Sequence, residues 1–329
     1  MKNIFLTLSV LISFLINAQT TKQGLKTDHG SSQKKYGASS TQNLINTLQH
    51  DTCLNKKFSI VFYVIQDSLY SLPNNPPIGP ASLASYSLTA IINLLNSTFA
   101  RICVSFENCK TVIIPNYSHN KWKAFGNGNM IVNTYFTENT INVYIPTEIQ
   151  PLLVDDPEAA YSYSPAPGGP SAQRNAIVLE KGSIGQSNAA TFFGSSILHA
   201  FGIFFGLPHT YDEINPSSPP SGPTPPANCT PPIKTLEYVD HTNISDCHTH
   251  GDGFCDTEAD PYPSSLTIPS TIPVGTGGCS TPGPTDGYNN YYVPPTDNFM
   301  SHYPCRCRFT QEQYNYMAYI ILTKRMYLH

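Results

Sequence analysis

Charged side chains are scarce in this sequence. They make up 12% of its 329 residues, and 22 acidic residues outnumber 18 Lys and Arg residues, which gives a formal net charge of −4. Such a chain lacks the clustered basic residues that bind a phosphate backbone, so we expect no nucleic-acid partner. Its solubility must depend on uncharged polar residues and on 20 tyrosines, a surface typical of exported proteins.

Long apolar runs are also missing, because no stretch after the N-terminus has the length of a bilayer span. Within the first 18 residues, Lys2 precedes an apolar core from Ile4 to Ile16, and Ala18 ends a small-residue cleavage site. This pattern is typical of a signal peptide, with an N-terminal strand or anchor as the alternative. We therefore expect a secreted or extracytoplasmic mature chain, with no membrane contact after residues 1–18 are removed.

The sequence has no Ser or Cys nucleophile motif, no phosphate-binding glycine loop and no internal repeat. Cysteine is plentiful by comparison, with nine residues, and in an exported chain this predicts disulfides and one unpaired or intermolecular thiol. Cys103 and Cys109 flank a short strand-like segment and are candidates for a local pair. Cys53 is expected either in a structural disulfide or as the odd thiol.

The apolar pattern predicts a mixed α/β (α+β) domain after a polar leader or pro-segment at residues 19–52. Buried strands are expected at residues 57–65, 102–106, 112–114, 141–145 and 175–179. Helices are expected at residues 82–100, at 187–205 and from Thr310, where Thr310 and Gln313 match a capping box. Proline-dense segments at residues 215–233 and 261–297 predict irregular loops held by cysteines, so we assign one domain to residues 53–329.

One apolar stretch ends in a way that brings two histidines together. Residues 199–209 read His-Ala-Phe-Gly-Ile-Phe-Phe-Gly-Leu-Pro-His. The run before Gly206 is proline-free and predicts a buried helix, which Gly206 ends in a left-handed residue and Pro208 cannot continue. A helix folded back in this way aims His199 and His209 at one point. The alternative is that both are packing histidines around an ordinary buried helix.

This stretch resembles the zinc signature of the metzincin metallopeptidases, H-E-x-x-H-x-x-G-x-x-H. In that signature two histidines one helical turn apart and a third from the returning chain bind zinc, while the glutamate takes a proton from the zinc-bound water. Here Ala200 stands at the glutamate position and Ile203 at the second histidine position. Losing a general base alone costs about 10²–10⁴-fold in rate. The sequence keeps the first and third histidines and the glycine of the signature, and it lacks the glutamate and the second histidine.

Further motifs resemble one metzincin family, the pappalysins. They are Gly206 to Thr210 (Gly-Leu-x-His-Thr), Gly251 to Thr257 (Gly-Asp-x-x-Cys-Asp-Thr), Asn298 to Ser301 (the methionine turn), and Cys305 followed by Arg308 to Thr310. The resemblance runs from about Lys57 to the C-terminus. It implies a metzincin-like metallopeptidase domain with a sheet and helices in the first part and an irregular, disulfide-bonded second part closed by a helix.

The resemblance also implies roles for single residues. Met300 would lie beneath the metal as a hydrophobic floor, a role close to that of an ordinary core methionine. His302 stands where many metzincins have a tyrosine near the metal, which suggests a rebuilt zinc site of His199, His209 and His302, since imidazole suits zinc. The alternative for His302 is a solvent-facing loop residue.

A second metal is implied by the loop at residues 251–257. Asp252 and Thr257 fall where some pappalysins bind calcium, which favours hard oxygen ligands. A disulfide-fixed acidic turn explains the same residues without calcium. His248 and His250 have the ligand type for a soft metal, although alternating histidines in exposed loops usually bind nothing.

Three functional hypotheses follow. The first is a catalytically inactive pseudopeptidase whose cleft binds a peptide or protein ligand, because Ala200 and Ile203 interrupt a well-kept framework. The second is an active zinc peptidase or altered metal hydrolase that uses the rebuilt three-histidine site. The third is a structural exported protein without a ligand.

Overall fold

The computed structural model describes residues 53–66, 85–123, 126–150, 160–162, 175–184, 192–212, 247–248, 251–258, 260, 294–301, 303 and 305–328. The expected signal peptide, the leader and most of the two proline-dense segments lie outside these residues, as does His302. None of the helices in the described part of the chain combines the length and the hydropathy that a bilayer span requires.

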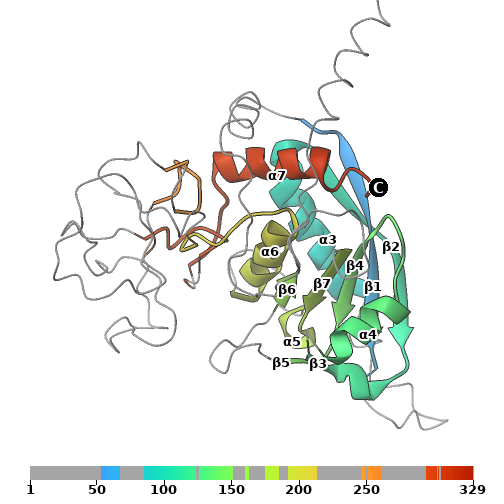
Figure 1. Cartoon of the computed structure of the whole chain (residues 1–329). Helices are drawn as coiled ribbons and strands as arrows, with labels where there is room; N and C mark the ends of the chain where they lie inside the picture. Colours follow the sequence, from blue (N-terminus) through green and yellow to red (C-terminus); the bar gives the residue numbers. More distant parts are fainter. Residues whose placement is uncertain are drawn as a thin grey trace, which may run out of the picture. The chain divides into compact units, whose positions relative to one another are not determined.

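A five-stranded sheet forms the centre of the described chain (Figure 1). Its strands, in spatial order, are β2 (Val104–Ile114), β1 (Lys56–Ile65), β4 (Ile141–Ile145), β7 (Ala176–Leu179) and β6 (Ala160–Ser162). All neighbours pair in parallel except β6, which runs antiparallel to β7 at one edge. The apolar runs of β1, β4 and β7 are typical of parallel strands covered on both faces.

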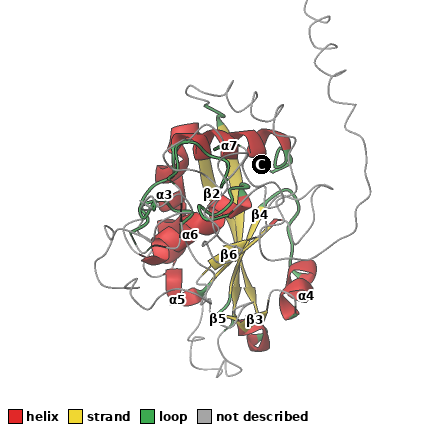
Figure 2. Cartoon of the chain, turned by 60° about the vertical axis from the view of Figure 1, so that its left-hand side comes forward, coloured by secondary structure: helices red, strands yellow, loops and turns green. Residues whose placement is uncertain are grey.

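Alternate residues of β1 enter two separate cores. Ile60, Phe62 and Val64 pack into the larger one, with the apolar faces of α3 (Ser85–Phe99), α6 (Phe192–Phe204) and α7 (Gln311–Thr323). Val61, Tyr63 and Ile65 enter the other core, which is covered by α4 (Asn127–Thr134) and by a two-stranded sheet of β3 (Lys121–Lys123) and β5 (Glu148–Gln150). Figure 2 shows α3 and α6 on one side of the sheet and α4 on the other.

The predicted α/β class and the closing C-terminal helix are confirmed. The expected strands at residues 57–65, 141–145 and 175–179 appear as β1, β4 and β7 within a residue at each end. The capping box of α7 is present, because the Gln313 N–H donates to Thr310 Oγ1 and the Thr310 N–H donates to Gln313 Oε1. The described part of the predicted helix at residues 187–205 is α6.

The two short strands expected at residues 102–106 and 112–114 are instead one strand, β2. Its polar middle is compatible with a strand because it lies at the sheet edge, where Asn108 and Lys110 are exposed. The register against β1 shifts between Ile60 and Val61, so Cys109 is an extra residue in a bulge. The sequence pattern does not predict β3, β5, β6, α4 or the short α5 (Lys181–Ile184).

The disulfides follow from which segments of the chain lie side by side. Cys53 bonds to Cys103, with Cα atoms 4.8 Å apart, so the expected Cys103–Cys109 pair is wrong. The Leu54 N–H donates to Ile102 O and the Lys56 N–H to Cys103 O, which places the start of β1 against this turn. Cys109 lies exposed in the bulge as a free thiol, and Cys307 is a second one, so the described residues hold more free thiols than the single one expected. Further bonds join Cys247 to Cys255 and hold Cys305, so disulfides lie in the C-terminal part as predicted.

Candidate functional site

The helix α6 ends in a turn that reverses the chain. The Gly206 N–H donates to Ile203 O at 2.8 Å and the Leu207 N–H to Gly202 O at 3.0 Å, the paired bonds of a Schellman motif. Gly206 has φ of 92°, which a residue with a Cβ atom adopts only with strain. Leu207 is buried beside the helix, and the chain returns along α6 to His209.

This reversal brings His199 and His209 together. Their ring centroids are 5.1 Å apart with an interplanar angle of 23°, and both side chains are half-buried. Tyr211 also stacks on His209, with ring centroids 4.8 Å apart and an interplanar angle of 7°. The pair therefore belongs to a group of stacked rings beside α6.

The two imidazoles are oriented through the same ring nitrogen. His199 Nδ1 lies 2.7 Å from Phe299 O, and His209 Nδ1 lies 3.2 Å from Asp212 Oδ2. Both partners only accept hydrogen bonds, so each Nδ1 carries a proton, and in a neutral ring the lone pair is then on Nε2. Metal-binding histidines are held in this way, with the second nitrogen donating to a carbonyl or a carboxylate.

The two positions that differ from the zinc signature hold apolar residues, and both residues pack against the hydrophobic core. Ala200 is fully buried in the larger core, and its carbonyl accepts a 2.6 Å hydrogen bond from Ser162 Oγ of β6. Ile203 is half-buried and packs against the same core. Asp212 is the carboxylate next to the pair among the described residues, and it faces Nδ1 of His209 rather than Nε2. Ala200 itself cannot accept a proton, so the glutamate role of the signature is not filled at this position.

Met300 lies directly against the helix that carries His199. A Cβ atom on Gly202 would lie 2.5 Å from Met300 Sδ, so a glycine is needed for this close approach. The turn is held by Asn298, whose Oδ1 accepts from the Met300 N–H and whose amide bonds to Gln313 of α7. The Thr210 N–H donates to Met300 O, which joins this turn to the segment after His209.

Two buried arginines fix the position of α6. Arg306 donates to Ser196 Oγ at 3.1 Å and to Ser301 O at 3.3 Å, and burial lowers its pKa to about 10. Arg325 donates from Nε and Nη2 to Phe204 O, the last carbonyl of the helix, and its guanidinium lies 3.8 Å above the Phe204 ring. Neither arginine carried a sequence signal, because a cation buried by distant segments has no local pattern.

The predicted calcium residues lie together. Asp252 is 3% exposed and accepts from Thr257 Oγ1 at 2.8 and 2.9 Å and from the Phe254 N–H. Burial raises the pKa of Asp252 well above its usual value. A second buried carboxylate, Asp260, accepts from Thr210 Oγ1 and the Tyr303 hydroxyl. The calcium role of Asp252 and Thr257 stays a prediction.

Known proteins offer a structural likeness and no sequence match. No family model matches the sequence, and no curated protein matches it significantly. The structure is similar to that of mirolysin, solved in complex with a compound, with 13% identity, a TM-score of 0.46, and coverage of 83% of this chain and 95% of mirolysin. It is also similar to archaemetzincin from Methanopyrus kandleri, with 9% identity, a TM-score of 0.29, and coverage of 46% of this chain and 76% of the other.

Proposed function

We propose that this chain is an exported metzincin-like protein of pappalysin type that has lost peptidase activity and binds a peptide or protein segment beside its histidine pair. The observation that carries the proposal is the pair itself: His199 and His209 lie together in the metal-binding tautomer, while Ala200 and Ile203 are buried or half-buried apolar residues. We infer that the chain keeps the frame of a metal site, in which Ala200 and Ile203 replace the glutamate and the second histidine of the signature.

The donor set fits zinc only in part. Catalytic zinc is held by three protein ligands and leaves a fourth position for water. The described residues supply two imidazoles, because an isoleucine occupies the position one helical turn after His199. If zinc binds here it would polarise its ligands, but Ala200 stands where the zinc signature has the glutamate that accepts a proton from water. We therefore propose weak zinc binding and no hydrolysis.

The edge strand β6 supports a peptide-binding role. Among the described residues it pairs with β7 on one side, and its other edge has no strand partner. Ser162 of β6 donates to the Ala200 carbonyl, so this edge lies beside the helix that carries His199. An extended peptide can add to such an edge as a further strand, bonded through its main chain. Its side chains would then lie next to the histidine pair.

The mature chain should cleave neither gelatin nor casein, with or without added zinc, because Ala200 replaces the glutamate that accepts a proton from metal-bound water. The natural chain and His199→Ala should give the same residual rate. In a parallel binding assay, labelled casein peptides are titrated with increasing concentrations of the chain. We expect the peptides to bind saturably.

Each other hypothesis gives a different result. Cleavage that a chelator abolishes and that His199→Ala removes would contradict the proposal and favour the rebuilt His199, His209 and His302 site. Absence of both cleavage and peptide binding would also contradict it and favour a structural role.

A further inference from the structure

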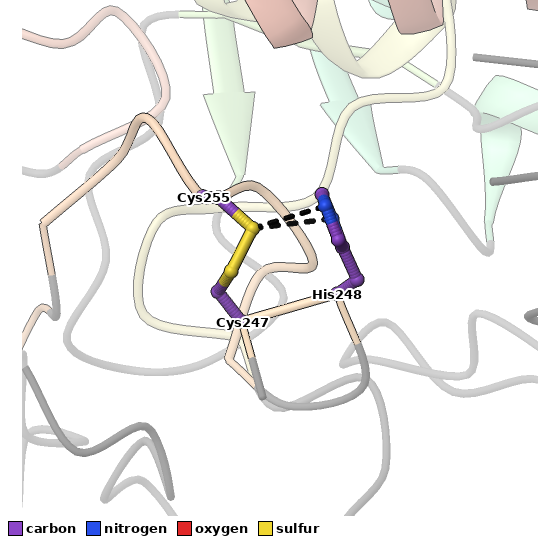
Figure 3. A group of neighbouring side chains, drawn as sticks. All are labelled: Cys247, His248 and Cys255. Carbon is purple, nitrogen blue, oxygen red and sulfur yellow. Dashed lines mark hydrogen bonds between the residues drawn. A yellow bond between two sulfur atoms is a disulfide. The ribbon is translucent and has the colours of Figure 1, made fainter. Parts of the chain in front are cut away.

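A group of three ligand-type side chains lies in the loop that packs against α7. Cys247 and Cys255 form a disulfide, and the imidazole of His248 lies against it (Figure 3). Cys255 Sγ is 3.1 Å from His248 Nε2 and 3.3 Å from His248 Nδ1, and the ligand atoms of all three residues lie within 4.8 Å of one another. None of these residues belongs to the His199–His209 pair.

The loop is held in place by contacts other than the disulfide. The Cys255 N–H donates to Glu312 Oε2 at 2.7 Å, and the Glu312 N–H donates to Asp256 Oδ2 at 2.8 Å, so the loop is bonded in both directions to the first turn of α7. Phe254 is 6% exposed and packs in the larger core with Tyr316. We therefore expect Cys255 to keep its position when the disulfide is opened.

We propose that the Cys247–Cys255 disulfide is a reducible lock on a zinc site formed by Cys247, His248 and Cys255. A dithiol reductant attacks one sulfur, and its second thiol then displaces the mixed disulfide, which yields an oxidised dithiol and two cysteine thiols. Zn²⁺ takes the place of the two thiol protons, and the neutral imidazole supplies the third ligand. The fourth position takes water.

Zinc binding by these three residues requires little movement of their side chains. With metal–ligand lengths of about 2.3 Å to sulfur and about 2.0 Å to nitrogen, tetrahedral zinc needs roughly 3.5 Å between a sulfur and a nitrogen ligand. The His248 ring is already at 3.1–3.3 Å from Cys255 Sγ. The main change is separation of the two sulfurs once their bond is broken, and the Cα atoms, 5.1 Å apart, allow it. Thiolate and imidazole are ligands that favour zinc.

The test uses the folded chain in its oxidised and reduced forms. A phosphine reduces the disulfides and leaves as its oxide, and Co²⁺ is then added without oxygen as a spectroscopic substitute for Zn²⁺. We expect one thiolate-bound Co²⁺ in the reduced chain, with a near-ultraviolet thiolate-to-cobalt band that Zn²⁺ removes. The oxidised chain should lack this band and bind at least about 100-fold more weakly, because two of three ligands are absent.

Variants assign the band to these residues. His248→Ala should retain the fold by circular dichroism and lower the affinity of the reduced chain about 10–100-fold or more. Cys53→Ser with Cys103→Ser should keep the band, whereas Cys247→Ser with Cys255→Ser should lose it. A folded, reduced natural chain without the band would overturn the proposal. So would a band that is unchanged in His248→Ala or in the Cys247→Ser, Cys255→Ser variant.

Discussion

An Ile203→His chain should bind zinc at least about 100-fold more tightly than the natural chain, a gain of about 2.7 kcal/mol. Residues 199 and 203 lie one turn apart on α6, which is continuous from Phe192 to Phe204, so their side chains share one face. His209 already lies 5.1 Å from His199 between ring centroids. The substitution therefore adds a third imidazole to two that are oriented. Calorimetry on the oxidised chain measures the difference.

Two matched variants separate ligation from packing. Ile203→Leu keeps the volume and apolar character of the side chain and should leave zinc affinity unchanged. Ile203→His combined with His199→Ala should return the affinity to about that of the natural chain, because only two imidazoles remain. Equal zinc affinity in Ile203→His and Ile203→Leu would mean that the helix does not present position 203 to the metal.

Arg325→Ala should lower the free energy of unfolding by about 3–5 kcal/mol, the largest loss of stability that we expect from a single site. Arg325 is 1% exposed and donates to Phe204 O and to Asn175 Oδ1 at 3.0 Å. Removing it leaves both buried acceptors without these donors and opens a cavity over the Phe204 ring. Urea denaturation of the oxidised chain measures the change.

Arg308→Ala is the matched control for this prediction. Arg308 is likewise an arginine with a side-chain partner, here the carboxylate of Asp297, but both side chains are substantially exposed, at 56% and 41%. Exposed ion pairs contribute about 0–1 kcal/mol, so we expect a small effect. Similar losses in Arg325→Ala and Arg308→Ala would contradict the role of Arg325 at the end of α6.

The elements that the sequence predicts well have long and regular patterns. The apolar run of β1, the helical spacing in α3 and the capping box of α7 each specify structure within one segment. The strands β3, β5 and β6 have three residues each and no period to detect. They are strands because neighbouring segments bond to them, and that information is not local.

The candidate site also has features that the sequence predicts and features that it does not. The turn that returns the chain to His209 follows from Gly206 and Pro208, which a sequence displays directly. The hydrogen-bond partners that orient the two imidazole rings are harder to recognise in the sequence. Asp212 lies three residues after His209 and could have been noticed, whereas Phe299 O, the partner of His199, comes from a segment one hundred residues away. The Cys53–Cys103 bond was missed because pairing depends on where β1 begins in space.

We propose that, among the described residues, the imidazoles of His199 and His209 are the two protein ligands for a metal at this site. X-ray absorption at the zinc edge, on the oxidised chain with one equivalent of zinc, tests it most directly. We predict two imidazole ligands with oxygen from water in the remaining positions, and loss of the imidazole signal in His199→Ala. Three imidazoles, or a carboxylate or sulfur ligand, would contradict the account.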